Sequence, residues 1–497
     1  MSQHFTATDA HPSIMDLPSV LTALYERAQL PLLSTAQGPL GLFVRYLRRK
    51  PARGLAVIYT VDEVRSSHKA RSNDPHRAVS LTLDEQALDG ALIRFSTAEA
   101  QEATPEVLDS GVLRVPDLGI SVQKFPADEH LPALAASCDT SPQSQLFLAL
   151  QAAAHAQLHD AAWQLISATA IPVRYKPANR CVIRYHLQLA HPAEKTSRTL
   201  TIFGKVYADP DQARSVQSLQ QQLYEEQAGD APLLPRPLGM IDTLGLTINE
   251  AVQVQNTQEQ AAPWDILRTG TRALQPQLER GRGGAITRVL VPEEELRLTA
   301  QALARLHTSA VRPNEATPRT GSKEAKRARE RAALIAKRNP DQANEVQRLA
   351  NTLATRLEQL QPDSYLPAHG GFKASQLLFH SQRVFVVDFD GFCLADPALD
   401  VGYFLAYLRP SGLWYHRPGM RQWFEAAAQV FRDTYHQALL ARGVADTDVQ
   451  AILVRARSYE AALLFKIATR RVNRLNSPRP QELATMLHEI ERCLANI

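Results

Sequence analysis

Residues 366–379 have the sequence LPAHGGFKASQLLF, and residues 384–392 have the sequence VFVVDFDGF. In the first segment a loop with polar side chains precedes an apolar run, and in the second an apolar run ends in two carboxylates, Asp388 and Asp390. Two such runs predict a β-hairpin. Asp388 follows four apolar residues, where a buried carboxylate is costly without a cation or hydrogen-bond donors. The pattern therefore favours a Mg²⁺ site at Asp388.

These segments resemble the aminoglycoside phosphotransferase and choline kinase-like family of the protein-kinase-like superfamily. In that family the pattern His-Gly-Asp, four residues and Asn precedes a strand that ends in a metal-binding aspartate, and a Gly-Asp-Pro-x-x-Asp pattern follows. The order and the spacing agree in this chain, but a glycine and a glutamine replace the family's loop aspartate and asparagine. The matching positions are His369, Gly370, Gly371, Gln376, Asp388 and the segment 395–400, ADPALD.

The resemblance implies a two-lobed, protein-kinase-like fold that uses ATP and Mg²⁺. It assigns Asp388 and Gln376 as metal ligands, since the side-chain carbonyl of a glutamine can still offer an oxygen to magnesium. Lys373 stands two positions after the missing aspartate, where protein kinases keep a lysine against the γ-phosphate. Asp390 is either a displaced catalytic base or a turn-forming residue. The candidate catalytic residues are Lys373, Asp388 and Asp390.

The glycine at position 371 decides how active the chain can be. In phosphoryl transfer the missing carboxylate orients the acceptor hydroxyl and takes its proton. Loss of a general base slows a reaction by about 10²–10⁴-fold, so slow catalysis would remain if metal and nucleotide are well placed. The resemblance further implies that hydrogen bonds of buried residues hold the catalytic loop. These structural residues are His307, His369, Asp396 and Asp400.

A second part of the expected nucleotide site lies upstream, at Lys205 in the apolar run LTIFGKVY. In the family a small-lobe lysine neutralises the α/β-phosphates and pairs with a glutamate of the next helix. Glu226 shares one helical stripe with apolar residues and is therefore the expected partner. Lys205 and Asp388 are then expected to face one triphosphate. The alternative for Lys205 is an ordinary lysine of an edge strand.

The segment 174–180 occupies the place of the loop that covers the phosphates in the family. It contains the sequence KPAN at 176–179 and has no glycine. Phosphate contacts there would have to come from the side chains of Lys176 or Arg180. The candidate cofactor-binding residues are therefore Lys176, Arg180, Lys205 and Glu226.

The whole chain is predicted to be α+β in three parts: an N-terminal α+β unit of unknown role (1–165), a β-rich kinase-like N-lobe (166–255) and a helical C-lobe (256–497). Strands are expected at 55–61, 78–83, 119–125, 181–187, 200–207 and 246–252. Helices are expected at 142–166, 209–228, 293–311, 322–360, 423–440 and 449–493. The basic run at 323–338 is either a solvated helix face or a contact for an anionic substrate or partner.

The N-terminal unit also shows a hint of duplication. Lys50, Pro51, Ala52 and Tyr59 match Lys176, Pro177, Ala178 and Tyr185 at a constant offset of 126 residues. Val79 would then stand where the second copy has Lys205, so that the first copy has lost its phosphate-binding cation. Chance remains the alternative, because four matches in ten positions are few. If real, the first copy is a degenerate small-lobe duplicate.

Composition points to a folded, soluble protein of several domains. The 497 residues are 44% hydrophobic and 21% charged, with 55 Lys and Arg against 51 Asp and Glu. This charge balance implies neither nucleic acid nor a membrane surface as a partner. The four cysteines form no CxxC pair, which argues against zinc or a disulfide framework. Residues 1–19 show no secretory signal, and we expect a cytoplasmic location.

Three functions remain open from the sequence. The first is an ATP-dependent kinase that phosphorylates the hydroxyl of a small molecule. The second is a pseudokinase that binds nucleotide, or nothing, and regulates a protein partner. The third is a helical scaffold in which the motif match is accidental. Magnesium-dependent nucleotide binding and ATP turnover distinguish the three.

Overall fold

The computed structural model describes residues 23–24, 26–28, 40–50, 54–63, 78–83, 104–109, 111–226, 232–252, 269–280, 286–313, 317–473 and 479–495. The chain divides into two compact units. Unit 1 contains residues 1–213, 238–248 and 475–477, and unit 2 contains residues 214–237, 249–474 and 478–497. Both helices and strands are present, as the α+β prediction required. Predictions made for residues 1–19, 51–52 and 227–228 lie outside the described residues.

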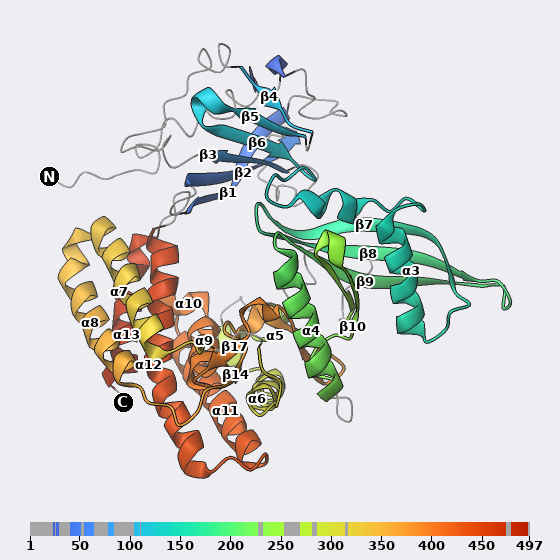
Figure 1. Ribbon diagram of the computed structural model, residues 1–497. Helices are drawn as coiled ribbons and strands as arrows, with labels where there is room; N and C mark the ends of the chain where they lie inside the picture. Colours follow the sequence, from blue (N-terminus) through green and yellow to red (C-terminus); the bar gives the residue numbers. More distant parts are fainter. Residues whose placement is uncertain are drawn as a thin grey trace. The chain divides into compact units, whose positions relative to one another are not determined.

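Unit 1 contains a six-stranded sheet with the order β1-β2-β3-β6-β5-β4 (Figure 1). The predicted hairpin of 55–61 and 78–83 is confirmed, because β2 pairs antiparallel with β3. The predicted strand at 119–125 is β6, while β1 was not predicted. The strands are β1 (Leu40–Lys50), β2 (Gly54–Glu63), β3 (Ala78–Leu83), β4 (Glu106–Val107), β5 (Val112–Val115) and β6 (Ile120–Lys124).

A five-stranded sheet of order β10-β11-β9-β8-β7 forms the second part of unit 1. Every second residue of β8 is buried, which gives this sheet one apolar face. Helix α3 (Gln145–Leu158) packs on that face, together with Phe125 and Leu131 (Figure 1). Residues before and after position 165 therefore share one hydrophobic core. The strands are β7 (Gln164–Lys176), β8 (Arg180–His191), β9 (Thr196–Tyr207), β10 (Pro237–Ile241) and β11 (Leu246–Glu250).

Two helix predictions were wrong in extent. The helix expected at 142–166 ends at Leu158, because His159 adopts a left-handed conformation with a φ of 56°, and β7 begins at Gln164. The helix expected at 322–360 is two helices, α7 (Gly321–Arg338) and α8 (Ala343–Gln359). Pro340 separates them, since proline lacks an N–H and disfavours the helical conformation of the residue before it.

The proposed duplication is not confirmed. Lys50 pairs with Gly54 and Lys176 pairs with Arg180, so the two hairpins have turns of the same length. The registers of the following strands differ, however. Tyr59 pairs with Val79, whereas the corresponding Tyr185 pairs with Ile202 rather than with Lys205. Val79 therefore does not occupy the place of Lys205.

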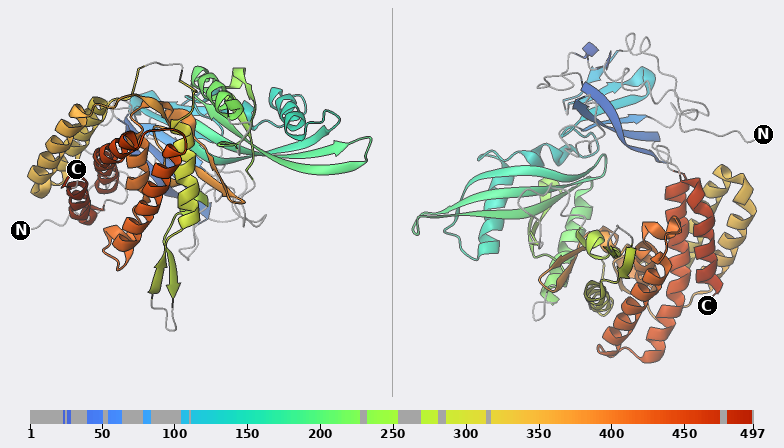
Figure 2. Two further views of the ribbon diagram at one scale, coloured as in Figure 1. Left: turned by 90° about the horizontal axis from the view of Figure 1, so that it is seen from below. Right: turned by 180° about the vertical axis from the view of Figure 1, so that it is seen from behind.

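Unit 2 is mainly helical and is built around α12 (Asp446–Val472), which contacts α7, α8, α9, α11 and α13. A hairpin of β12 (Gln277–Arg280) and β13 (Ile286–Leu290) projects from these helices (Figure 2, left). The helices expected at 293–311 and 423–440 are confirmed with changed ends, and the stretch 449–493, expected to be helical, contains two helices, α12 and α13. The other helices are α4 (Pro210–Glu226, in unit 2 from residue 214), α5 (Thr269–Ala273), α6 (Glu293–His307), α9 (Ala398–Leu408), α10 (Ser411–Trp414), α11 (Met420–Leu440) and α13 (Leu483–Ala495).

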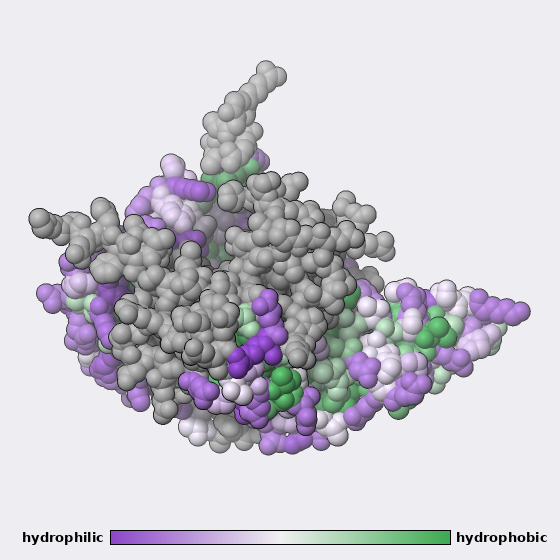
Figure 3. Space-filling model, turned by 90° about the horizontal axis from the view of Figure 1, so that it is seen from above, coloured by the Kyte–Doolittle hydropathy of each residue, from purple (hydrophilic) through white to green (hydrophobic). Residues whose placement is uncertain are grey.

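The surface of the described residues mixes hydrophilic and hydrophobic side chains, as the view in Figure 3 shows. Ile166 of β7 and Leu148 of α3 are among the large apolar side chains that are exposed. Scattered apolar residues of this kind are normal on protein surfaces. None of the helices described in the structure is long and apolar enough to span a membrane.

Candidate functional site

Two short antiparallel pairs of strands frame the segment that suggested a metal site. β14 (Leu366–Ala368) pairs with β17 (Cys393–Ala395), and β15 (Leu377–His380) pairs with β16 (Arg383–Val386). The predicted hairpin is therefore confirmed. Its two-residue turn has positive φ angles of 45° and 61°, which suit the twist of a hairpin. Loop 369–376 and Asp388 lie between these two strand pairs in the sequence.

Gln376 and Asp388 lie side by side in unit 2. The Gln376 Nε2 donates a hydrogen bond to the Asp388 Oδ2 at 3.4 Å. Gln376 is buried, and its Oε1 has no hydrogen-bond partner among the described residues. Asp388 has a left-handed φ of 72°, a conformation that is uncommon outside glycine but is adopted more readily by aspartate than by most residues.

The oxygens of this pair suit a magnesium ion that is held partly by phosphates. They are too few for a metal that is coordinated by protein side chains alone. Mg²⁺ is commonly held by one or two protein ligands together with phosphates of the substrate. Gln376 Oε1 and the Asp388 carboxylate supply such oxygens. Among the described residues, no group of three or more His, Cys, Asp or Glu side chains is placed to hold a metal ion. The residues present therefore fit a magnesium ion that arrives with a nucleotide.

His369 anchors loop 369–376 from inside the core. Its ring lies between Phe372 and Phe389, with centroid distances of 5.9 and 5.1 Å. Burial lowers the pKa of His369 below its usual value, so the ring is neutral near pH 7. The neutral ring can donate from Nε2 to the Val387 carbonyl oxygen, at 3.1 Å, immediately before Asp388. His369 thus links the loop to the residue that immediately precedes the metal-binding candidate Asp388.

Asp400 on α9 holds the same loop from the other side. Its Oδ2 accepts a hydrogen bond from the His369 backbone N–H at 2.5 Å and lies 3.5 Å from the His307 Nε2. The Nδ1 of His307 lies 2.7 Å from the Tyr435 hydroxyl. Burial raises the pKa of Asp400, but the interactions with His307 and His369 outweigh burial and bring this pKa below its usual value. The structural roles expected for these residues are confirmed.

Asp396 fixes the start of α9. Its Oδ1 accepts a hydrogen bond from the Ala398 backbone N–H, and Arg455 of α12 donates to both carboxylate oxygens, at 2.8 and 3.2 Å. Such paired contacts between a guanidinium and a carboxylate are strong and directional. Asp396 therefore has the structural role that the sequence predicted.

Arg319 is a half-buried part of the site that the sequence did not reveal. It donates to the Gly370 carbonyl oxygen at 2.7 Å, to Glu324 at 2.8 Å and to the Tyr403 hydroxyl at 2.8 Å. The Glu324 side chain is only 1% exposed, and it also accepts from Arg327. Burial raises the pKa of Glu324, but the nearby arginines outweigh burial and bring this pKa below its usual value. Arg319 thus ties loop 369–376 to α7 and α9.

Replacing Arg319 with alanine is expected to destabilise unit 2 by about 3–5 kcal/mol, because it leaves a buried carboxylate only partly compensated. Arg329→Ala is the matched control. Arg329 pairs with Glu358, and the two side chains are 44% and 41% exposed, so its loss should cost less than about 1 kcal/mol. Urea denaturation of both variants measures the difference. Equal losses of stability would contradict the structural role of Arg319.

Lys373 and Asp390 lie close in sequence to the Gln376–Asp388 pair. Lys373 precedes the short 3-10 helix Ala374–Gln376, and its Nζ lies 5.2 Å from the centroid of the Tyr407 ring. Asp390 lies in the 3-10 turn Phe389–Gly391 that follows Asp388. This place suits both of the roles considered for Asp390, the displaced base and the turn residue.

Lys205, Lys176 and Arg180 belong to unit 1. Lys205 lies in β9 between the buried residues Gly204 and Val206, and its Nζ lies 5.0 Å from the centroid of the Tyr207 ring. It therefore points to the sheet face opposite the core of unit 1. Lys176 and Arg180 form the last pair of the β7–β8 hairpin.

The turn between Lys176 and Arg180 is fixed by Asp128, which the sequence analysis did not identify. Asp128 is 2% exposed, and its Oδ2 accepts hydrogen bonds from the Tyr175 hydroxyl at 2.7 Å and the Ala178 N–H at 2.8 Å. These contacts bridge about fifty positions of sequence, and no local pattern could have predicted them. Asp128 holds the segment that was expected to cover phosphates.

Glu226 is the last residue of α4 and belongs to unit 2. The Glu226 side chain is exposed because helix α4 ends there, whereas Val216, Leu219 and Leu223 on the same stripe are buried. Its carboxylate accepts hydrogen bonds from the Ser309 hydroxyl and the Ala310 N–H, both at 2.5 Å. Its pairing with Lys205 stays a prediction.

Residues 274–447 match the model of a phosphotransferase enzyme family. No curated protein matches the chain. Among solved structures, a glucosamine kinase is 16% identical, with 94% of this chain and 96% of that chain covered and a TM-score of 0.39. A spectinomycin phosphotransferase in complex with ADP and spectinomycin is 14% identical, with 66% and 89% covered and a TM-score of 0.38. An ethanolamine kinase of Plasmodium vivax is 11% identical, with 75% and 95% covered and a TM-score of 0.39.

The matched residues include loop 369–376, Asp388 and Asp400, which carried the resemblance noted in the sequence. The resemblance noted in the sequence is therefore confirmed over residues 274–447, which match the model of the phosphotransferase enzyme family.

Proposed function

We propose that this chain is an ATP-dependent phosphotransferase that acts on the hydroxyl of a small molecule. The observation that carries the proposal is the Gln376–Asp388 pair, whose oxygens suit a nucleotide-bound magnesium ion. The match to a phosphotransferase family over 274–447 supports the same reaction class.

In this proposal Asp388 and Gln376 would hold a magnesium ion, which would supply positive charge to the phosphates. Lys205 neutralises the α/β-phosphates with Glu226 as its partner, and Lys373 faces the γ-phosphate. Lys176 and Arg180 supply phosphate contacts from the β7–β8 turn. The acceptor oxygen bonds to the γ-phosphorus as the bond from that phosphorus to ADP breaks. The hydroxyl proton passes to solvent or to Asp390, since Gly371 offers no carboxylate.

The second candidate is a pseudokinase that binds nucleotide without transferring phosphate, and that binds a protein partner. Gly371 in place of the loop aspartate favours it. The proposal also divides the chain at residues 165 and 255, into an N-terminal unit, a kinase-like N-lobe and a helical C-lobe.

Nucleotide binding tests both candidates directly. Mg·ADP at 100 times its Kd should stabilise the chain by about 2.7 kcal/mol, visible as a rise in Tm that is absent without magnesium. Asp388→Ala should abolish the magnesium-dependent part of this rise, and Lys205→Ala should weaken nucleotide binding. Asp433→Ala, at an exposed position of α11, is the control and should change neither.

Turnover then separates the two candidates. Slow ATP consumption that depends on Asp388 supports the enzyme, whereas binding without turnover supports the pseudokinase. A wild-type chain with no response to Mg·ADP would contradict both.

A further inference from the structure

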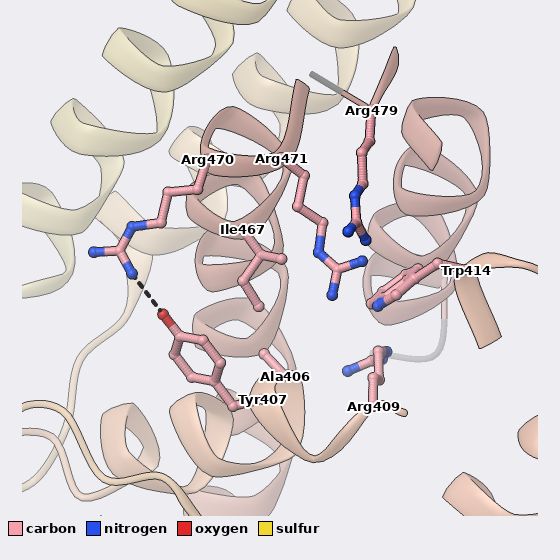
Figure 4. A pocket seen from close by; sticks show the side chains of 8 residues that line it. All are labelled: Ala406, Tyr407, Arg409, Trp414, Ile467, Arg470, Arg471 and Arg479. Carbon is pink, nitrogen blue, oxygen red and sulfur yellow. Dashed lines mark hydrogen bonds between the residues drawn. The ribbon is translucent and has the colours of Figure 1, made fainter. Parts of the chain in front are cut away.

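A cavity of about 240 Å³ in unit 2 is lined chiefly by cationic and aromatic side chains from α9, α10, α12 and the segment after α12 (Figure 4). Four of its lining residues are arginines, and no carboxylate is among its lining residues in the described part of the chain. The polar and aromatic residues that matter here are Tyr407, Arg409, Trp414, Arg470, Arg471 and Arg479.

The charges around this arginine cavity are only partly balanced. Arg471 and Arg479 both donate to Glu482, so two guanidinium groups share one carboxylate. Arg470 donates to the Tyr407 hydroxyl at 3.1 Å, and this partner is neutral. Figure 4 shows Arg471 and Arg479 extending toward Trp414 and Arg470 extending toward Tyr407. Arg409, by contrast, is buried and paired with both Glu460 and Glu489.

Lys466 on α12 is a further basic side chain close to Arg470. It lies one helical turn before Arg470, and its Nζ lies 3.3 Å from the Tyr403 hydroxyl. Burial and the nearby Arg470, Arg331 and Arg319 lower the pKa of Lys466 to about 7, although Glu324 acts in the opposite direction. An anion bound nearby would compensate this repulsion.

Tyr407 connects the arginine cavity with loop 369–376. One side of the connection is the Lys373 ammonium, 5.2 Å from the centroid of the Tyr407 ring. The other side is the hydrogen bond from Arg470 to the Tyr407 hydroxyl. A single tyrosine thus lies between the lysine expected at the γ-phosphate and the arginines of the cavity.

We propose that the arginine cavity binds a phosphate or carboxylate group carried by the acceptor, whose hydroxyl then lies at loop 369–376. Arginine suits this task because its planar donors match the oxygens of both groups. The inference rests on the proposed phosphotransferase function and names its substrate class: an acceptor that is anionic rather than neutral or cationic. A free anion that regulates the chain from the same cavity is the alternative outcome.

Inorganic phosphate is the first probe, titrated calorimetrically into the full chain in the presence of Mg·ADP and, in a parallel titration, without nucleotide. The double variant Arg470→Gln/Arg479→Gln is expected to weaken phosphate binding at least about ten-fold, since it removes two charge-assisted donors. Arg348→Gln removes an exposed arginine that pairs with Glu491 elsewhere in unit 2, and it should leave phosphate affinity unchanged. Equal affinities of the double variant and the wild type would overturn the proposal.

The second probe is a set of acceptors that differ in charge: glucose, glucuronate and glucose 6-phosphate. With Mg·ATP the wild type is expected to favour the anionic acceptors at least about ten-fold in kcat/KM, and the double variant should lose this preference. Inorganic phosphate should compete with the acceptor. Inhibition by phosphate that is not competitive with the acceptor would overturn the acceptor role and indicate a regulatory anion.

The two proposals fail in different ways. A normal magnesium-dependent response to ADP, combined with a phosphate affinity that does not depend on Arg470 and Arg479, would overturn only the arginine cavity. Phosphate binding that depends on these arginines, without any response to Mg·ADP or Mg·ATP, would overturn the phosphotransferase function and the acceptor role with it.

Discussion

Replacing Gly371 with aspartate is expected to raise the rate of phosphotransfer by about 10²–10⁴-fold, the usual contribution of a general base. The backbone has room for this change. A Cβ placed on Gly371 meets only the Gln376 Nε2, at 3.9 Å, and Gly371 is not among the glycines with a positive φ. The new carboxylate would stand in loop 369–376 beside the Gln376–Asp388 pair, where it can orient the acceptor hydroxyl and take its proton.

Gly371→Asn is the matched control for this prediction. Asparagine has nearly the shape of aspartate, but its amide does not accept a proton at neutral pH. Initial rates with Mg·ATP should therefore rise for the aspartate variant and stay near the wild-type value for the asparagine variant. Equal rates for the two variants, with folding and nucleotide binding intact, would show that the missing base does not limit catalysis.

The hairpin and the metal-binding candidates could be predicted because their information is local. The runs at 377–379 and 384–387 are short and apolar, and Asp388 directly follows the second run. The strand β7 was missed for a local reason as well. Its sequence, QLISATAIPVRYK, contains Pro172 and follows an alanine-rich helix. Pro172 is tolerated because β7 is an edge strand with a register shift at that point.

The contacts of Arg319 and Asp128 could not be predicted from the sequence. Arg319 reaches Gly370 and Tyr403, which lie 51 and 84 positions away. Asp128 reaches Ala178 over 50 positions. Neither residue belongs to a periodic pattern, and a charged residue in a loop is usually exposed. These side chains stabilise loops of the site because residues that are distant in the sequence surround them. Only the fold shows which residues surround them.

Gly370→Ala is expected to be among the most damaging single changes in unit 2. Gly370 has a φ of +72°, and a Cβ there would lie 2.1 Å from the Gly391 carbonyl oxygen. The left-handed conformation costs an L-residue about 1–2 kcal/mol, and forced overpacking adds about 1–3 kcal/mol. The Gly370 carbonyl is also held by Arg319, so the loop cannot move away freely. The Tm of the variant, measured by calorimetry, tests this loss of stability.

Two other glycines separate the causes of that loss. Gly443→Ala imposes only the backbone cost, because Gly443 has a φ of +82° and no atom within 4 Å of an added Cβ. Gly371→Ala imposes neither cost, since its Cβ position is open. The expected order of destabilisation is therefore Gly370, then Gly443, then Gly371. If Gly370→Ala were no worse than Gly443→Ala, the close approach of Gly391 would not constrain the loop. If the close approach of Gly391 does constrain the loop, Gly371→Asp should fail to raise the rate of phosphotransfer when it is combined with Gly370→Ala.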